Sequence, residues 1–133
     1  METAITIRDE MTSRLSRPEF VFTLPVASER LSVREIIRAR VQQEVEAYNG
    51  QQPEHFRGLV QPTGAEQTLN GFRMPKARQI DWQKQYQKAL EAFEGNGFIV
   101  MINDRQVEDL DTVVEVTPDM GVTFLKLVPL VGG

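Results

Sequence analysis

The sequence contains no cysteine, so disulfides, thiolate metal ligands and a cysteine nucleophile are all unavailable to it. Its single histidine, His55, stands in a polar stretch, and we expect it to be neither a metal ligand nor a base. The chain has no run of about 18 apolar residues and no basic segment followed by an apolar one at its N-terminus. We therefore expect a cytoplasmic protein without metal or cofactor.

An excess of basic residues is also missing. The chain has 15 Lys and Arg against 19 Asp and Glu, a net charge of −4, which gives no electrostatic basis for binding nucleic acid or an anionic membrane. No combination of nucleophile, base and orienting group is recognisable, so we do not expect an enzyme. A hydrophobic content of 41% over 133 residues predicts a single folded domain, residues 1–133, with protein partners.

Two strands and a helix are predicted in the first half of the chain. Residues 4–7 and 20–26 are β-branched or aromatic runs, which we interpret as an antiparallel hairpin with a long connection. Ser32 and Glu35 have the spacing of a capping box at a helix N-terminus. Asn49-Gly50 supplies the expected helix stop. The helix between them carries an apolar stripe of Val33, Ile37, Val41, Val45 and Tyr48.

Residues 50–80 are rich in Gly and Pro and show no sustained period. A structureless loop of that length is unusual in a compact domain, so this inserted loop is functional, partly ordered on a partner, or contains elements that the pattern does not reveal. A second helix follows, with Asp81 as N-cap and an end at Gly95. Its apolar stripe is Trp82, Tyr86, Ala89, Leu90 and Phe93. Residues 98–104 and 122–129 then favour strands, with a turn and a short strand over 105–116.

The segments 20–48 and 97–133 resemble ubiquitin. The stretch "FVFTLPVASERLSVREIIRARVQQ" is similar to its second strand and central helix, and "RQVEDLDTV" to its turn before the last strand, while the chain ends in "PLVGG". The resemblance implies an α+β fold, the ubiquitin-like β-grasp, in which a mixed sheet packs on one main helix. Residues 50–96, the insert, have no counterpart in ubiquitin. The chain is thus identified as resembling bacterial ubiquitin-like modifiers, which are encoded beside activating enzyme, conjugating enzyme and JAB-type isopeptidase homologues.

The resemblance also implies that the terminal carboxylate is the reactive group. An activating enzyme would adenylate Gly133 with ATP and take the acyl group as a thioester, and a conjugating enzyme would pass it to lysines of target proteins. A deconjugating isopeptidase would reverse the step. Gly132 and Gly133 offer a slender end for a narrow enzyme channel. Leu130 and Val131 would be recognised with them, on a flexible tail of residues 129–133.

A partner surface follows from alignment on "RQVED" and on the terminal glycines. It places Met101, Leu125 and Leu127 near the apolar patch through which ubiquitin meets most partners. Strict alternation in the last strand would then turn Lys126 inward, whereas a bulge or a slip of one residue would exchange the two faces. The assignment of this surface therefore stays open, and all three apolar residues are equally compatible with the core.

Two other functions fit the same sequence. The apolar tail "GVTFLKLVPLVGG" also resembles the tails of small sulfur carriers, in which the terminal adenylate becomes a thiocarboxylate. A ubiquitin-like interaction domain that is never activated is the second alternative. Loss of Gly133 discriminates between them, because an interaction domain should tolerate it.

Overall fold

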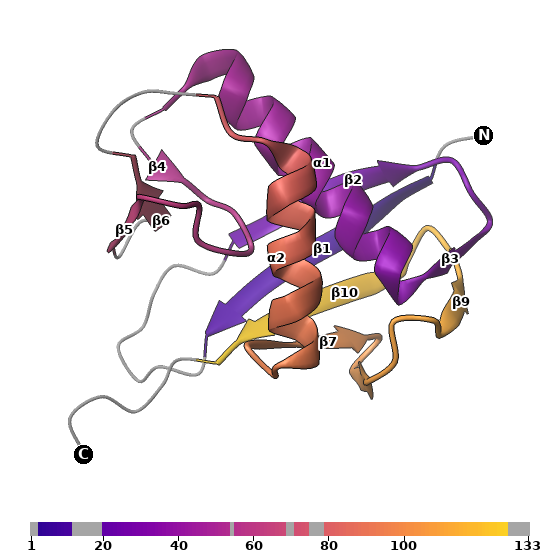
Figure 1. Cartoon of the computed structure of the whole chain (residues 1–133). Helices are drawn as coiled ribbons and strands as arrows, with labels where there is room; N and C mark the ends of the chain where they lie inside the picture. The colour runs from indigo at the N-terminus through magenta and orange to yellow at the C-terminus, as the bar shows by residue number, and fades with distance from the viewer. Residues whose placement is uncertain (1–2, 12–19, 54, 69–70, 75–78, 128–133) are drawn as a thin grey trace.

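A mixed five-stranded sheet packed on two helices forms the body of the protein (Figure 1). The computed structural model describes residues 3–11, 20–53, 55–68, 71–74 and 79–127. The sheet order is β2-β1-β10-β7-β8, with β1 and β10 parallel and the other neighbours antiparallel. Its strands are β1 (Thr3–Met11), β2 (Phe20–Val26), β7 (Phe98–Ile102), β8 (Arg105–Val107) and β10 (Gly121–Lys126). The predicted α+β class and the β1–β2 hairpin are confirmed.

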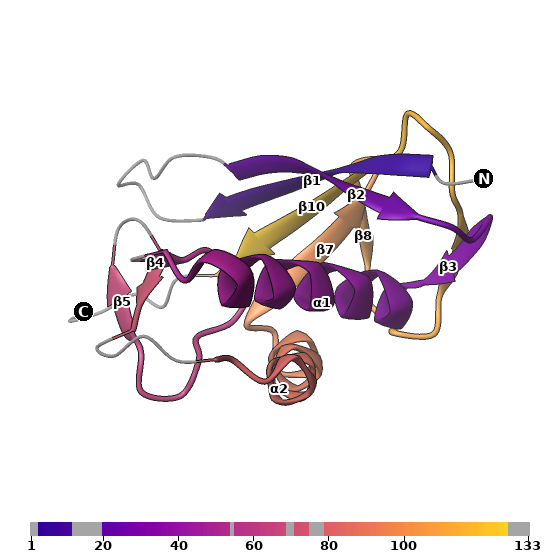
Figure 2. The ribbon, with the colours of Figure 1, turned by 90° about the horizontal axis from the view of Figure 1, so that it is seen from above.

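Helix α1 (Val33–Gln51) lies across one face of this sheet, and α2 (Trp82–Glu94) packs against α1 (Figure 2). Two short strands, β3 (Arg30–Ser32) and β9 (Val113–Glu115), pair with each other beside the start of α1. The core between the layers includes Ile5, Ile7, Ile37, Val41, Val100 and Phe124, all with 0% of their surface exposed. No helix of the described residues is long and apolar enough to span a membrane.

The start of α1 is as predicted, but its end is not. The Ser32 hydroxyl accepts a hydrogen bond from the amide of Glu35, whose carboxylate accepts one from the amide of Ser32. The helix continues through Asn49 and Gly50, and Gln52 is the first left-handed residue, with φ 45°. The expected stop at Asn49-Gly50 is therefore wrong. Asn49 instead bridges to Ile80, donating to its carbonyl (2.9 Å) and accepting from its amide (2.8 Å).

The inserted loop expected over residues 50–80 contains secondary structure, so the element assignment for this stretch was incomplete. Part of this stretch forms a small antiparallel sheet of order β4-β6-β5, with strands β4 (His55–Phe56), β5 (Glu66–Thr68) and β6 (Gly71–Arg73). Strands of two or three residues are too short to show an alternating pattern, which is why they could not be recognised from the sequence. Apolar residues of the same stretch enter the core: Phe56, Leu59, Ala65, Met74 and Ile80. The insert is thus part of the packed body.

Helix α2 follows its predicted stripe closely. Asp81 accepts a hydrogen bond from the amide of Gln83 and caps the helix. Ala89, Leu90 and Phe93 are buried, whereas Trp82 and Tyr86 are half-buried. The Phe93 ring lies 5.9 Å from that of Phe98, and Phe98 lies 5.9 Å from Phe124. This aromatic series joins α2 to the middle of the sheet.

The Asn49 bridge gives a direct test of how the insert is attached. Replacing Asn49 with alanine leaves the partly buried Ile80 amide and carbonyl without these partners, and we expect the free energy of unfolding to fall by about 1–2 kcal/mol. Urea denaturation followed by circular dichroism measures the change. Gln87→Ala on the exposed face of α2 is the matched control. An equal effect of both substitutions would contradict the role of the bridge.

Candidate functional site

The last strand carries the chain toward its C-terminal segment. β10 ends at Lys126, and the Leu127 amide donates to the carbonyl of Gly97 at 3.2 Å, which continues the pairing beside β7 by one residue. Gly132 and Gly133, and with them Leu130 and Val131, lie outside the described residues. Their roles stay predictions. Leu127, the last described residue, is six residues before Gly133.

Lys126 points to the helix side of the sheet, as strict alternation in β10 predicts. Val122 and Phe124 are buried on that side, and Lys126 follows them at the next alternate position. Its Nζ donates to the carbonyl of Gly58 at 2.9 Å and lies 5.9 Å from the centre of the Phe72 ring. The carbonyl of Gly58, a residue of the insert, thus binds the side chain of Lys126, the last residue of β10.

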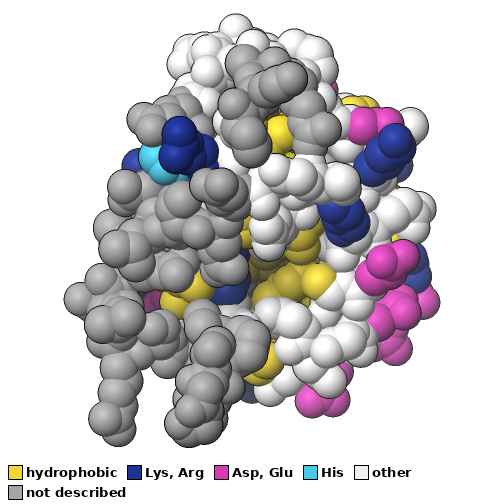
Figure 3. All heavy atoms as spheres, turned by 60° about the vertical axis from the view of Figure 1, so that its left-hand side comes forward, with side chains coloured by type: hydrophobic (Ala, Val, Ile, Leu, Met, Phe, Trp, Pro, Cys, Tyr) yellow, Lys and Arg dark blue, Asp and Glu magenta, His cyan; other side chains and the backbone are white. Residues whose placement is uncertain are grey.

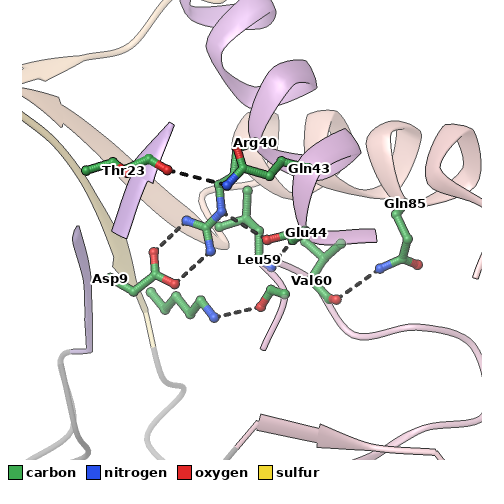
Figure 4. A network of polar contacts seen from close by, with 10 residues as sticks. Asp9, Thr23, Arg40, Gln43, Glu44, Leu59, Val60 and Gln85 are labelled. Carbon is green, nitrogen blue, oxygen red and sulfur yellow. Dashed lines mark hydrogen bonds and ion pairs between the residues drawn. The ribbon is translucent and has the colours of Figure 1, made fainter. Parts of the chain in front are cut away.

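A buried polar network connects this point to the rest of the fold (Figure 4). Arg40 in α1 is 0% exposed and donates to both carboxylate oxygens of Asp9 in β1, Nη2 lying 2.7 Å from Oδ2. Its Nε donates to Glu44 at 3.1 Å, one helical turn further along α1. The guanidinium also lies 4.5 Å from the centre of the Phe124 ring. Arg40 therefore ties β1, α1 and β10 together.

Glu44 extends the network to the insert. Its Oε1 accepts the amide hydrogen of Leu59 at 3.0 Å, next to Gly58, whose carbonyl binds Lys126. Two consecutive insert residues are thereby held in place: Leu59 by the carboxylate of Glu44 and Gly58 by the ammonium group of Lys126. Formal charges of Asp9 and Glu44 are balanced by those of Arg40 and Lys126. Such compensation is what a group of charges in a largely dry site requires.

Desolvation by burial acts in opposite directions on the pKa values of Glu44 and Arg40. Desolvation raises the pKa of the Glu44 carboxyl above its ordinary value, and the attraction of Arg40 and the hydrogen bond from Leu59 offset only part of that rise. For Arg40, desolvation alone would lower the pKa, but the combined attraction of Glu44 and Asp9 raises it. Arg40 thus stays charged, and the Glu44 carboxyl binds a proton more readily than an exposed glutamate does.

The predicted partner surface lies on the opposite face of the sheet from the helices. Leu125 is paired with Ile99, and Thr123 with Met101, in the β10–β7 ladder. Paired residues of neighbouring strands share a face, so Ile99, Met101 and Leu125 form one partly exposed apolar group. Leu127, also partly exposed, follows just after the strand. Ile99 was missed from sequence, although the period of two in β7 points to it.

His55 is the remaining candidate residue from the sequence. His55 lies in β4 rather than in a loop, directly opposite Arg73 of β6. Within the described part of the chain no three His, Cys, Asp or Glu side chains gather in a way that could hold a metal ion. Comparison with protein families, with curated proteins and with solved structures finds no match.

The polar network was not foreseen from the sequence. One signal for it exists: Arg40 and Glu44 fall on the same helical stripe as Ile36, Ile37 and Val41, three or four residues apart. A charge at such a position either reaches solvent along its stem or requires a buried partner. Asp9 lies 31 residues away in the sequence, so no local pattern could have identified it.

Removing Arg40 tests the network. We expect Arg40→Met to lower the free energy of unfolding by about 3–5 kcal/mol, because it leaves the Asp9 carboxylate buried without its partner. Arg30→Met is the matched control, since Arg30 and Glu115 are 72% and 80% exposed and 3.8 Å apart; it should change stability little. Thermal and urea unfolding measure both. A small loss in Arg40→Met would contradict the account.

A second prediction concerns pH. Because the folded-state pKa of Glu44 is raised, the folded protein binds a proton more tightly than the unfolded chain does, for which a glutamate pKa of about 4.3 is typical. The contribution of Glu44 to stability is therefore fully present below about pH 4 and falls as pH rises through the folded-state pKa. In Glu44→Gln this part of the pH dependence is absent. The stability of the native protein relative to the variant should fall as pH rises above about 4, and a rise would contradict this assignment.

Proposed function

We propose that the protein is a ubiquitin-like modifier of the β-grasp type, joined to lysine amines of target proteins through Gly133. The observation that supports this most is topological. The sheet has the order β2-β1-β10-β7-β8 around a parallel central pair, α1 crosses it, and its central strand β10 leads into the sequence that ends in Gly132-Gly133. That order is the one expected of a β-grasp, and β10, the middle strand of the sheet, is the last strand before Gly132-Gly133 in the sequence.

The chemistry of the proposal takes place at the terminal carboxylate. A Gly133 oxygen attacks the α-phosphate of ATP on an activating enzyme and pyrophosphate leaves. A cysteine thiolate of that enzyme displaces AMP to give a thioester, and a conjugating enzyme passes the acyl group to a lysine. The lysine amine loses a proton and the thiolate leaves as the isopeptide forms. An isopeptidase hydrolyses that bond with water. The protein is a substrate in every step.

Each part of the molecule has a role in this proposal. Gly132 and Gly133 give the end of the chain a slender form that a narrow channel accepts, and Val131 and Leu130 are recognised beside them. The apolar group of Met101, Leu125 and Leu127 serves as a docking surface for partner enzymes, with Ile99 as an addition. Arg8 and Glu10 of β1 are paired with Thr123 and Leu125, so charged side chains border this apolar group.

The insert has a defined place in this proposal. The Gly58 carbonyl binds Lys126, the last residue of β10, and the Leu59 amide binds Glu44 of α1. We infer that the insert provides recognition by the activating or conjugating enzyme that belongs to this protein. Its removal would also expose core surface, since Phe56 and Leu59 are buried. Surface substitutions on the insert are therefore a better test of recognition than its deletion.

A sulfur carrier remains the second candidate. It is favoured by one feature, the absence of any charged residue after Lys126, which differs from the basic tail of ubiquitin. In that case the Gly133 adenylate is converted to a thiocarboxylate and no protein conjugate forms. A ubiquitin-like interaction domain would use neither reaction.

Deletion of Gly133 tests the proposal in cells. The protein, tagged at its N-terminus and expressed in its native host, should give covalent species of higher mass on denaturing gels. Deleting Gly133 should abolish them, because the acyl group would then come from a shorter end that no longer fits the activating site. Asp104→Asn, an exposed change in the turn between β7 and β8, is the control and should preserve them. Equal species from both variants would contradict conjugation through Gly133.

A further inference from the structure

One segment of the insert is held in place by side chains rather than by strand pairing. It covers residues 58–63, which we call the strap, and lies between β4 and β5. Three elements bind its backbone through their side chains: Lys126 of β10 at the Gly58 carbonyl, Glu44 of α1 at the Leu59 amide and Gln85 of α2 at the Val60 carbonyl, 3.1 Å away. Figure 4 shows these contacts converging on consecutive strap residues.

The far end of the strap is held by Lys88 of α2. Its Nζ donates to the Gln61 carbonyl at 3.3 Å and to the Thr63 hydroxyl at 2.8 Å. Between described residues, no hydrogen bond joins the strap backbone to the backbone of the sheet or of a helix; the Pro62 carbonyl accepts from the amide of Ala65, within the insert. The strap can therefore leave its place without breaking a strand pair or a helix.

A glycine stands at each end of the strap. Gly64, just beyond it, has φ 80° and is the third residue of a turn that the bond between Pro62 and Ala65 closes. At Gly58 an added Cβ would lie 2.1 Å from Phe56 Cε2, so a larger residue does not fit. Glycine has the widest choice of backbone dihedrals, and such positions serve as hinges.

Little apolar surface attaches the strap. Its Leu59 and Pro62 are buried, whereas Gln61 and Thr63 are exposed. The insert side of the molecule shows hydrophobic side chains mainly in a depression, among polar side chains and backbone (Figure 3). Local opening is expected where buried apolar contacts are few and hydrogen bonds lie near solvent. The strap has both features.

Glu44 lies behind the strap. Its side chain is 10% exposed, and its Oε1 accepts the amide hydrogen of Leu59. The charged or titratable groups around it come from four elements: Arg40 of α1, Asp9 of β1 bound to Arg40, Lys126 of β10, and His55 and Arg57 of the insert, which line the same hollow as Glu44. When the strap opens, water reaches the Glu44 carboxylate while Arg40 stays beside it.

The proton affinity of Glu44 therefore differs between the two forms. With the strap closed, burial raises the pKa of the Glu44 carboxyl. Opening removes the hydrogen bond from Leu59, which by itself would raise that pKa, but desolvation is the larger cause and is relieved at the same time. The pKa is thus lower in the open form, and rising pH favours opening.

We propose that residues 58–63 open as one unit while the sheet and both helices stay folded, and that opening releases a proton from Glu44. Opening breaks the contact between the insert and Lys126, the last residue of β10. The proposal does not depend on whether Gly133 is ever conjugated. It is therefore tested on the isolated full-length chain.

Amide hydrogen exchange followed by NMR measures the opening. Relative to intrinsic rates, the Leu59 amide should exchange at least about tenfold faster than those of Val41 and Phe124 in the middle of α1 and β10. Lys88→Ala should raise the Leu59 rate by about threefold to tenfold, although Lys88 binds the other end of the strap. Lys84→Ala, an exposed change on the same helix, is the control and should leave it unchanged.

Either of two results would overturn the opening of the strap as a unit. Equal protection of Leu59, Val41 and Phe124 would show that the strap opens only when the whole protein unfolds. An unchanged Leu59 rate in Lys88→Ala would show that the two ends of the strap move independently.

The proton is tested by the pH dependence of the same amide. The ratio of the Leu59 rate to its intrinsic rate should rise as pH rises above about 4. Glu46→Gln, at an exposed position of α1, should keep this rise and Glu44→Gln should lose it. A ratio independent of pH in the native protein, or the same rise in Glu44→Gln, would overturn the release of a proton from Glu44.

Discussion

The guanidinium of Arg40 is enclosed in the core, so protein groups alone must balance its charge. Asp9 and Glu44 do so from two different elements, and the Phe124 ring lies against its face. Each of these contacts fixes a relative position: β1 to α1, one turn of α1 to the next, and α1 to β10. A buried ion pair contributes little net stability compared with apolar packing, but it penalises any arrangement that separates its members. We interpret the network as the feature that sets the register of α1 on the sheet.

The position of the insert depends on that network. Glu44 has a second carboxylate oxygen to use, and the Leu59 amide occupies it; Gly58 offers its carbonyl to Lys126 in the same turn of chain. The insert is thus attached at the end of the sheet where β10 gives way to the C-terminal segment. This placement brings the insert and the C-terminal end of β10 to one end of the molecule.

The sequence predicted what depends on neighbouring residues. The capping box at Ser32, the Asp81 cap and the stripes of both helices all rest on contacts within a few residues. The features that could not be predicted from the sequence depend on contacts between residues far apart in the chain. Asn49 remains helical because Ile80 engages its side chain, 31 residues away. Strands β4 to β6 exist through mutual pairing, and Lys126 meets Gly58 across 68 residues. Periodicity carries no information about such pairs.

The central claim is that Gly133 is a point of covalent attachment. Peptide mass spectrometry on the protein recovered under denaturing conditions from its native host tests it most directly. The account predicts peptides in which the carbonyl of Gly133 is joined to lysine amines of other proteins. A thiocarboxylate at Gly133 would contradict conjugation and establish a sulfur carrier. A free carboxylate throughout would contradict any activation of the chain end and leave the protein as an interaction domain.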